Sequence, residues 1–185
     1  MKTPTTDHHQ RSFDDAVKGL LAGDFSRLAS LFEGAADSSQ CPIIQWHEAG
    51  RFASEPQALA EAFTCACFLG LTDVAQYFLA LGSNPAGGMG TGLNAIHWAA
   101  NRGQLEVVRL LIQHQVPLET RNSYGGTVFG GTVWAAIHEA KPDHPRIIEA
   151  LLDAGAQVRE AEFPSGSEHI DEILHGYGAA SNTTP

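Results

Sequence analysis

The clearest hydrophobic pattern in the chain is a pair of amphipathic segments that repeat with a spacing of 33 residues. Ala66 and Ala99, Gly70 and Gly103, and Val74 and Val107 occupy equivalent positions. In the second segment small apolar residues precede the glycine, and an apolar stripe with helical spacing follows it. This pattern predicts two short helices joined at a glycine, which adopts left-handed backbone angles at low cost.

Neither helix of such a pair is long enough to be stable on its own in water. Stacking against neighbouring pairs must therefore supply the burial, as in solenoid proteins. A third segment continues the pattern with Ile147 and Ile148 in place of Val107 and Val108, but at a spacing of 40 residues instead of 33. The interpretation is a tandem array of helix pairs with seven extra residues before the last second helix.

These segments resemble the ankyrin repeat, which has a 33-residue period and a T-P-L-H-x-A signature. The signature here reads Asn94-Ala95-Ile96-His97-Trp98-Ala99-Ala100, and residues 103–114, "GQLEVVRLLIQH", closely match the second helix of the family. The resemblance implies an all-α solenoid with short β-turn fingers, the connections that lead into each first helix, and a C-terminal cap helix. It also implies that His97 bonds backbone groups of its turn. The chain is similar to small, single-domain ankyrin-repeat proteins of bacterial type.

The repeat register also sets the expected boundaries. A degenerate first unit with the form helix–Gly23–helix is followed by a long proline-containing connection, and one amphipathic helix with Ile170, Ile173 and Leu174 caps the C-terminal end. We expect polar tails at residues 1–11 and 179–185, repeat units at about 12–36, 56–86, 89–121 and 122–160, and a cap at 163–178.

A short duplication, GGTVF at 125–129 followed by GGTVW at 130–134, accounts for most of the extra length. We assign five of the seven extra residues to the first copy, as an insertion in the finger, and two to the turn around "KPDHP". On this interpretation the first helix of the unit begins near Thr132, and Trp134 replaces the leucine of the signature and is buried.

Composition narrows the range of possible partners. The chain has 11 Lys and Arg against 21 Asp and Glu, a formal charge of −10, which does not suit nucleic-acid binding or docking on an anionic membrane. A partner surface should be neutral or basic. Three cysteines form no disulfide framework, and the N-terminal stretch has no signal-peptide apolar core. We therefore expect a cytoplasmic monomer.

No motif in the sequence indicates catalysis, a metal site or a cofactor. Gly125-x4-Gly130-Gly131-Thr132 has the outline of a phosphate loop, but glycine stands where the lysine is needed. The nine histidines show no zinc-ligand spacing, and Cys65 and Cys67 should point to different faces of one helix. A small-molecule or metal-dependent enzyme is the third and least supported hypothesis.

The favoured site is the concave surface that the fingers and the first helices form together. Its candidate partner-binding residues are Met89, Thr91, Leu93, Asn101, Arg102, Ser123, Tyr124 and Phe129. Tyr124 and Phe129 either anchor a partner on a lengthened finger or fold down onto Trp98 and Trp134. The predicted function is a non-catalytic protein–protein interaction module. The alternative is an acidic inhibitor or immunity-type protein that neutralises a basic partner.

Overall fold

The computed structural model describes residues 4–33, 41–88, 90 and 92–180, and these residues form nine α-helices, several short 3-10 turns and no β-strand. The expected all-α helical-repeat fold is therefore confirmed. The α-helices are α1 (Pro4–Ala22), α2 (Pro42–Glu48), α3 (Pro56–Leu69), α4 (Thr72–Ala80), α5 (Ala95–Asn101), α6 (Leu105–Gln113), α7 (Val128–His138), α8 (His144–Asp153) and α9 (Glu168–Gly176).

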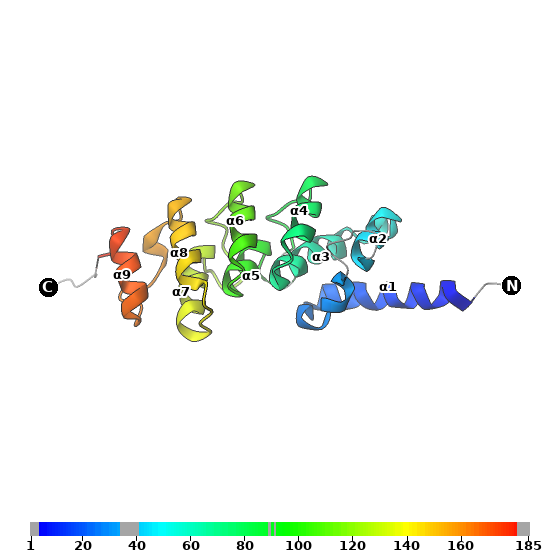
Figure 1. The fold of residues 1–185 in the computed structure, drawn as a ribbon, viewed down its shortest axis with the longest axis horizontal. Helices are drawn as coiled ribbons and strands as arrows, with labels where there is room; N and C mark the ends of the chain where they lie inside the picture. The colour runs from blue at the N-terminus through cyan, green and yellow to red at the C-terminus, as the bar shows by residue number, and fades with distance from the viewer. Residues whose placement is uncertain (1–3, 34–40, 89, 91, 181–185) are drawn as a thin grey trace.

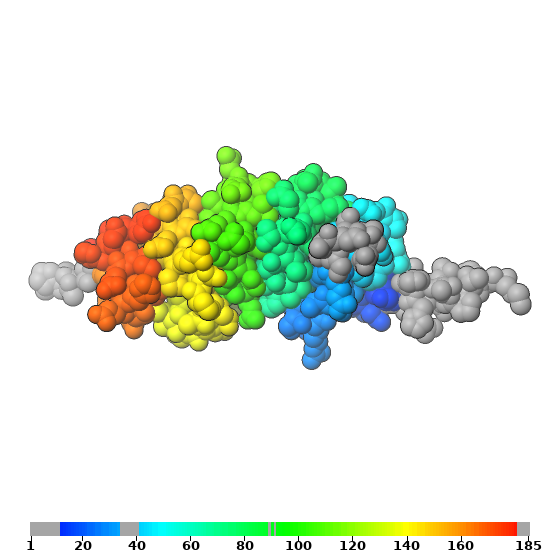
Figure 2. Space-filling view, in the orientation of Figure 1, coloured from blue at the N-terminus to red at the C-terminus, as the bar shows by residue number. Residues whose placement is uncertain are grey.

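The helices stack as pairs along one long axis, with the two ends of the chain at opposite ends of the molecule (Figure 1). The first helices α3, α5 and α7 contact one another in one row, and the second helices α4, α6 and α8 do so in another. The space-filling view shows the repeats as successive bands of colour along that axis (Figure 2). Each pair therefore depends on its neighbours for burial, as the hydrophobic pattern predicts.

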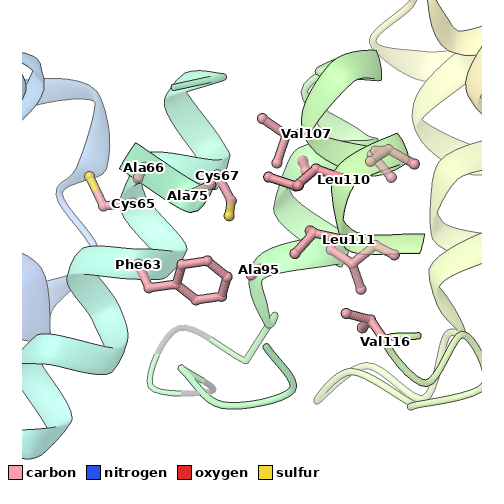
Figure 3. Packing of buried hydrophobic residues seen from close by; sticks show 14 of the residues in the cluster. Phe63, Cys65, Ala66, Cys67, Ala75, Ala95, Val107, Leu110, Leu111 and Val116 are labelled. Atoms are coloured by element: carbon pink, nitrogen blue, oxygen red, sulfur yellow. The ribbon is translucent and has the colours of Figure 1, made fainter. Parts of the chain in front are cut away.

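Small buried side chains allow the first helices to approach closely. Ala66, Ala99 and Ala100 are all fully buried. Figure 3 shows Phe63 and Cys67 of α3 facing the next repeat, where Val107 and Leu111 of α6 lie. Cys65 points the other way, and its thiol lies 4.0 Å from the carbonyl oxygen of Phe25. The two thiols thus fill both interfaces of one helix.

The ends of the helices follow the sequence signals in the central repeat. Asn94 is the N-cap of α5, and its Oδ1 accepts from the backbone N–H of His97 at 3.2 Å and lies 2.6 Å from Nδ1 of the same residue. Gly103 has φ +76° after the C-terminus of α5, and a Cβ there would come within 2.7 Å of the Lys141 side chain. The signature residues therefore fix both the start and the end of the helix.

The predicted start of the first helix in the fourth repeat was wrong. α7 begins at Val128, not near Thr132, and its N-cap Thr127 lies 33 residues after Asn94 and accepts from the backbone N–H of Gly130. The unit therefore keeps the period up to its N-cap, and Phe129 takes the buried position that Ile96 has in α5. The first copy of the duplication, not the second, carries the signature.

The extra residues lengthen α7 and the turn after it, and they do not lengthen the finger. α7 has 11 residues and α5 has seven. Residues 139–143 connect α7 to α8, whereas residues 102–104 connect α5 to α6. In the ribbon view α7 extends beyond α5 at the lower side (Figure 1).

The N-terminal unit also differs from expectation. α1 starts at Pro4, inside the expected polar tail, and the predicted second helix after Gly23 is replaced by 3-10 turns at Phe25–Arg27 and Ala29–Phe32. The expected connection contains α2, which starts with Pro42 at its first turn and buries Ile43, Ile44 and Trp46. Nδ1 of His47 in α2 lies 3.0 Å from the hydroxyl of Tyr77 in α4, so α2 contacts the second helix of the next unit.

At the C-terminal end, α9 packs on α8 and buries Ile170 and Leu174, as expected for a cap helix.

The duplicated glycines in α7 should respond differently to alanine. A Cβ at Gly130 would lie 2.6 Å from the backbone oxygen of Glu160, whereas one at Gly131 would make ordinary contacts with Asn101 Oδ1 at 3.5 Å and Asn122 Nδ2 at 4.0 Å. We expect Gly130→Ala to lower the free energy of unfolding by about 1–3 kcal/mol through steric overlap. Gly131→Ala should leave it unchanged or raise it by up to about 1 kcal/mol, because alanine favours a helix. Urea denaturation measures both, and equal effects would contradict the packing described.

Candidate functional site

A groove of about 640 Å³ lies between the third and fourth repeats. Its walls are the C-terminal part of α5, the 122–126 turn and α7. Its volume is in the range of roughly 300–1,000 Å³ typical of ligand sites. Its lining is mostly apolar or aromatic, with a few polar groups: Leu93, Trp98, Asn101, Arg102, Asn122, Tyr124, Gly126, Gly130, Gly131, Trp134, Ala135, Glu139 and Glu160.

Glycines create part of this hollow. Gly126, Gly130 and Gly131 line the groove without a side chain, and the last two lie in the interior of α7, where glycine costs about 1 kcal/mol relative to alanine. Gly130 is required there because the backbone of Glu160 approaches closely. Gly131 has room for a small side chain, and the groove is larger because glycine has none.

The 122–126 turn is held by its own hydrogen bonds. Asn122 Oδ1 accepts from the backbone N–H groups of Tyr124, at 2.9 Å, and Gly126, at 3.0 Å. Arg121 donates to the Gly125 carbonyl at 2.7 Å and to the Glu160 carboxylate at 2.8 Å. The turn therefore presents the Tyr124 ring, which is 83% exposed, from a fixed backbone.

Two further aromatic residues form the walls. Trp134 is 56% exposed and stacks on the His138 ring, with centroids 4.4 Å apart and planes at 17°. His138 Nδ1–H donates to the Trp134 carbonyl at 2.8 Å, which fixes the imidazole. Trp98 is half-buried and packs edge-on against Phe68, with centroids 5.2 Å apart. Among the aromatic side chains of the groove, Trp98 is therefore held by packing, whereas Tyr124 and Trp134 are exposed.

The charged groups of the groove differ in how far they are already engaged. The Arg102 guanidinium lies over the Phe68 ring, 4.8 Å from its centroid, and Glu160 is paired with Arg121. Glu139 forms no ion pair with any described residue. Asn101 Oδ1 is buried and has no hydrogen-bond partner among the described residues. Asn101 and Glu139 therefore have acceptor oxygens that no described residue pairs with.

His144 connects this wall to the second-helix layer. The Lys141 backbone N–H donates to His144 Nδ1 at 3.1 Å, so Nε2 carries the proton and donates to the Asn101 carbonyl at 3.2 Å. Burial lowers the pKa of this imidazole below its ordinary value of 6.5, and the backbones of Asn101 and Ala100 oppose the shift. Burial likewise lowers the pKa of His97, against the opposing effect of the backbones of Gly126 and Thr120.

Four of the eight predicted partner-binding residues line the groove: Leu93, Asn101, Arg102 and Tyr124. Ser123 lies beside it, and its backbone N–H donates to the Gly92 carbonyl at 2.9 Å, which joins the two fingers. Met89 and Thr91 lie outside the described residues. Their binding role stays a prediction.

Phe129 and Trp134 exchange the roles that the sequence suggested. Phe129 is fully buried in α7 and cannot anchor a partner, while Trp134, expected in the core, lies open in the groove. Thus only Tyr124 of the expected aromatic pair is exposed. Sequence reasoning also missed Asn122 and Glu139. The 33-residue step from Asn94 to Thr127 would have shown where α7 begins, and therefore that Asn122 and Glu139 lie on either side of it.

Other chemistry has little support in the described residues. No group of three or more His, Cys, Asp or Glu side chains among them is placed to hold a metal ion. Burial raises the pKa of the Cys65 and Cys67 thiols strongly, which keeps them as unreactive core groups. Within the described part of the chain, no helix combines the length and apolar character needed to span a membrane.

A family model of three ankyrin repeats matches residues 62–161, more than half of the chain, and this range corresponds to α3–α8 and their connections. The chain therefore belongs to the ankyrin-repeat family. Ankyrin repeats form protein–protein interaction modules and are generally non-catalytic. A search of curated proteins finds no match for the chain.

The buried imidazoles predict a loss of stability in mild acid. The unfolded chain binds a proton at His144 near pH 6.5 and the folded chain only at lower pH, so the free energy of unfolding is fully retained above 6.5 and falls as the pH drops below it. His144→Gln should reduce this slope. It should also cost about 1–3 kcal/mol at pH 7.5, because the bond to Asn101 is lost.

Urea denaturation between about pH 5 and 8 checks both effects. His114→Gln, at an exposed position after α6, is the matched control. An unchanged slope in His144→Gln would show that this imidazole is not the group that titrates.

Proposed function

We propose that this chain binds a segment of a partner protein in the groove between α5 and α7. The observation that carries the proposal is the position of the two most exposed large hydrophobic side chains among the described residues. Tyr124, at 83%, and Trp134, at 56%, both line this one groove. Exposed aromatic side chains that share a concave surface are typical of interaction sites, because they bury much apolar area at little cost in side-chain entropy.

The rigidity of the walls supports the same proposal. The 122–126 turn is held by Asn122 and Arg121, and α7 is held by its cap Thr127 and by buried Phe129. A partner segment would therefore meet a surface that is already ordered, which lowers the entropy lost on binding.

Deletion of Gly125–Phe129 is not a clean test of this function. The deletion would remove the N-cap Thr127 and the buried side chains of Val128 and Phe129. It would therefore change the core of the repeat, so a loss of binding would not report on the groove alone. Point substitutions of exposed side chains avoid this problem.

The double variant Tyr124→Ala and Trp134→Ala should weaken partner binding by at least about tenfold, because aromatic anchors carry much of the free energy of binding. Affinity capture from native cells, with quantitative mass spectrometry, measures it against the unaltered chain. Leu81→Ser, which removes a 51% exposed side chain outside the groove, is the matched control. Partners retained by the double variant at unaltered levels would place the binding surface elsewhere.

The acidic-inhibitor role is a second candidate, and the charge of −10 favours it. If the partner is strongly basic, its association rate should fall steeply as ionic strength rises from about 0.02 to 0.3 M, because the Debye length shortens over this range. Stopped-flow measurement with a captured partner tests this, and glycerol at matched viscosity controls for bulk effects. A rate independent of salt would remove the inhibitor role and leave the general interaction module.

A further inference from the structure

The groove carries information about the chemistry of its ligand as well as its position. Apart from Arg102, which already lies over Phe68, its charged side chains are carboxylates. Glu160 is neutralised by Arg121 at 2.8 Å, which leaves Glu139 as the carboxylate without an ion pair in the described part of the chain. Glu139 can therefore pair with a cationic group that enters the groove.

A second acceptor in the groove lacks a partner. Asn101 Oδ1 is buried without a hydrogen bond to any described residue. Asn122, the other amide of the groove, already accepts two backbone N–H groups. Because the Asn101 oxygen has almost no accessible surface, a ligand could donate to it only if the Asn101 side chain turned toward the groove.

The repeat register brings these acceptors to one end of the groove. Asn101 is the last residue of α5, and Trp134 holds the equivalent position in the longer helix α7. Glu139 follows Trp134 by five residues and is the C-cap of α7. The extra helical turn thus places a carboxylate beyond an exposed indole.

The Trp134 ring is suited to a flat cation. One face stacks on His138, with centroids 4.4 Å apart, yet the residue remains 56% exposed, so the opposite face is open. A guanidinium group can stack on an indole and donate in its own plane to two acceptors, whereas an ammonium group is a point charge without a planar face.

We infer that the groove recognises an arginine side chain of an extended, basic partner segment, with the guanidinium stacked near Trp134 and directed to the Glu139 carboxylate. This inference rests on the proposed function of the groove. The other walls, Tyr124 and Trp98, receive the aliphatic part of the arginine and its neighbours.

The test is a titration of the ¹⁵N-labelled full chain with an acetylated, amidated Gly-Gly-Arg-Gly-Gly peptide. The expected result is a saturable shift of the Trp134 indole N–H and the Gly131 amide. A second peptide, with citrulline in place of arginine, keeps the shape and removes the charge, and it should bind at least about tenfold more weakly. A Gly-Gly-Leu-Gly-Gly peptide tests a merely apolar ligand.

Two charge-matched variants complete the test. Glu139→Gln should bring the affinities of the arginine and citrulline peptides together, whereas Glu149→Gln, on the exposed side of α8 and outside the groove, should leave their ratio unchanged. Equal affinities for the two peptides in the unaltered chain would overturn the inference. A ratio that survives Glu139→Gln, or the absence of saturable shifts with the arginine peptide, would overturn it too.

Failure of this inference can be told apart from failure of the proposed function. A captured partner that depends on Tyr124 and Trp134 but binds Glu139→Gln unchanged leaves the groove as a binding site with another ligand chemistry. A partner indifferent to both aromatic residues removes the binding site itself.

Discussion

Burial between neighbouring helix pairs is the interaction on which the structure depends. α5 and α6 have only seven and nine residues, too few to be stable alone, and their apolar faces are covered by the pairs on either side. Alanines keep the first helices close together, while aromatic and aliphatic residues fill the space between the rows. The regular spacing of the repeats, and therefore of their concave surface, follows from this packing.

The groove arises where that regularity is broken. α7 keeps the register of α5 at its N-cap, so buried Phe129 maintains the contact between repeats. Trp134 lies at the position where α5 ends, and the extra turn that follows it leads to Glu139, so both can line the groove because the core is complete without them. The two internal glycines lower the helix propensity of α7 but open the wall of the groove. The groove thus lies at a position where the fold can tolerate the change.

The sequence predicted the fold correctly at positions where a residue type has a single structural role. Gly70 and Gly103 end first helices, and Ile170 and Leu174 are the buried residues of the cap helix, all as expected. The duplication defeated the prediction because both copies read as a threonine followed by two apolar residues. Only tertiary packing decides that Phe129 is buried and Trp134 exposed. α2 was missed for a similar reason, since its seven residues show too little periodicity to stand out.

The candidate site also shows why stability and recognition are linked in this repeat pair. His144 donates to the carbonyl of Asn101, so a buried residue of the second-helix layer fixes the end of α5 that lines the groove. On the opposite wall, Arg121 and Glu160 tie the 122–126 turn to the segment after α8. The groove therefore has no independent loop that could order on its own. Its geometry is inherited from the stacking of the third repeat on the fourth, and a change in that stacking would alter the groove before it unfolded the chain.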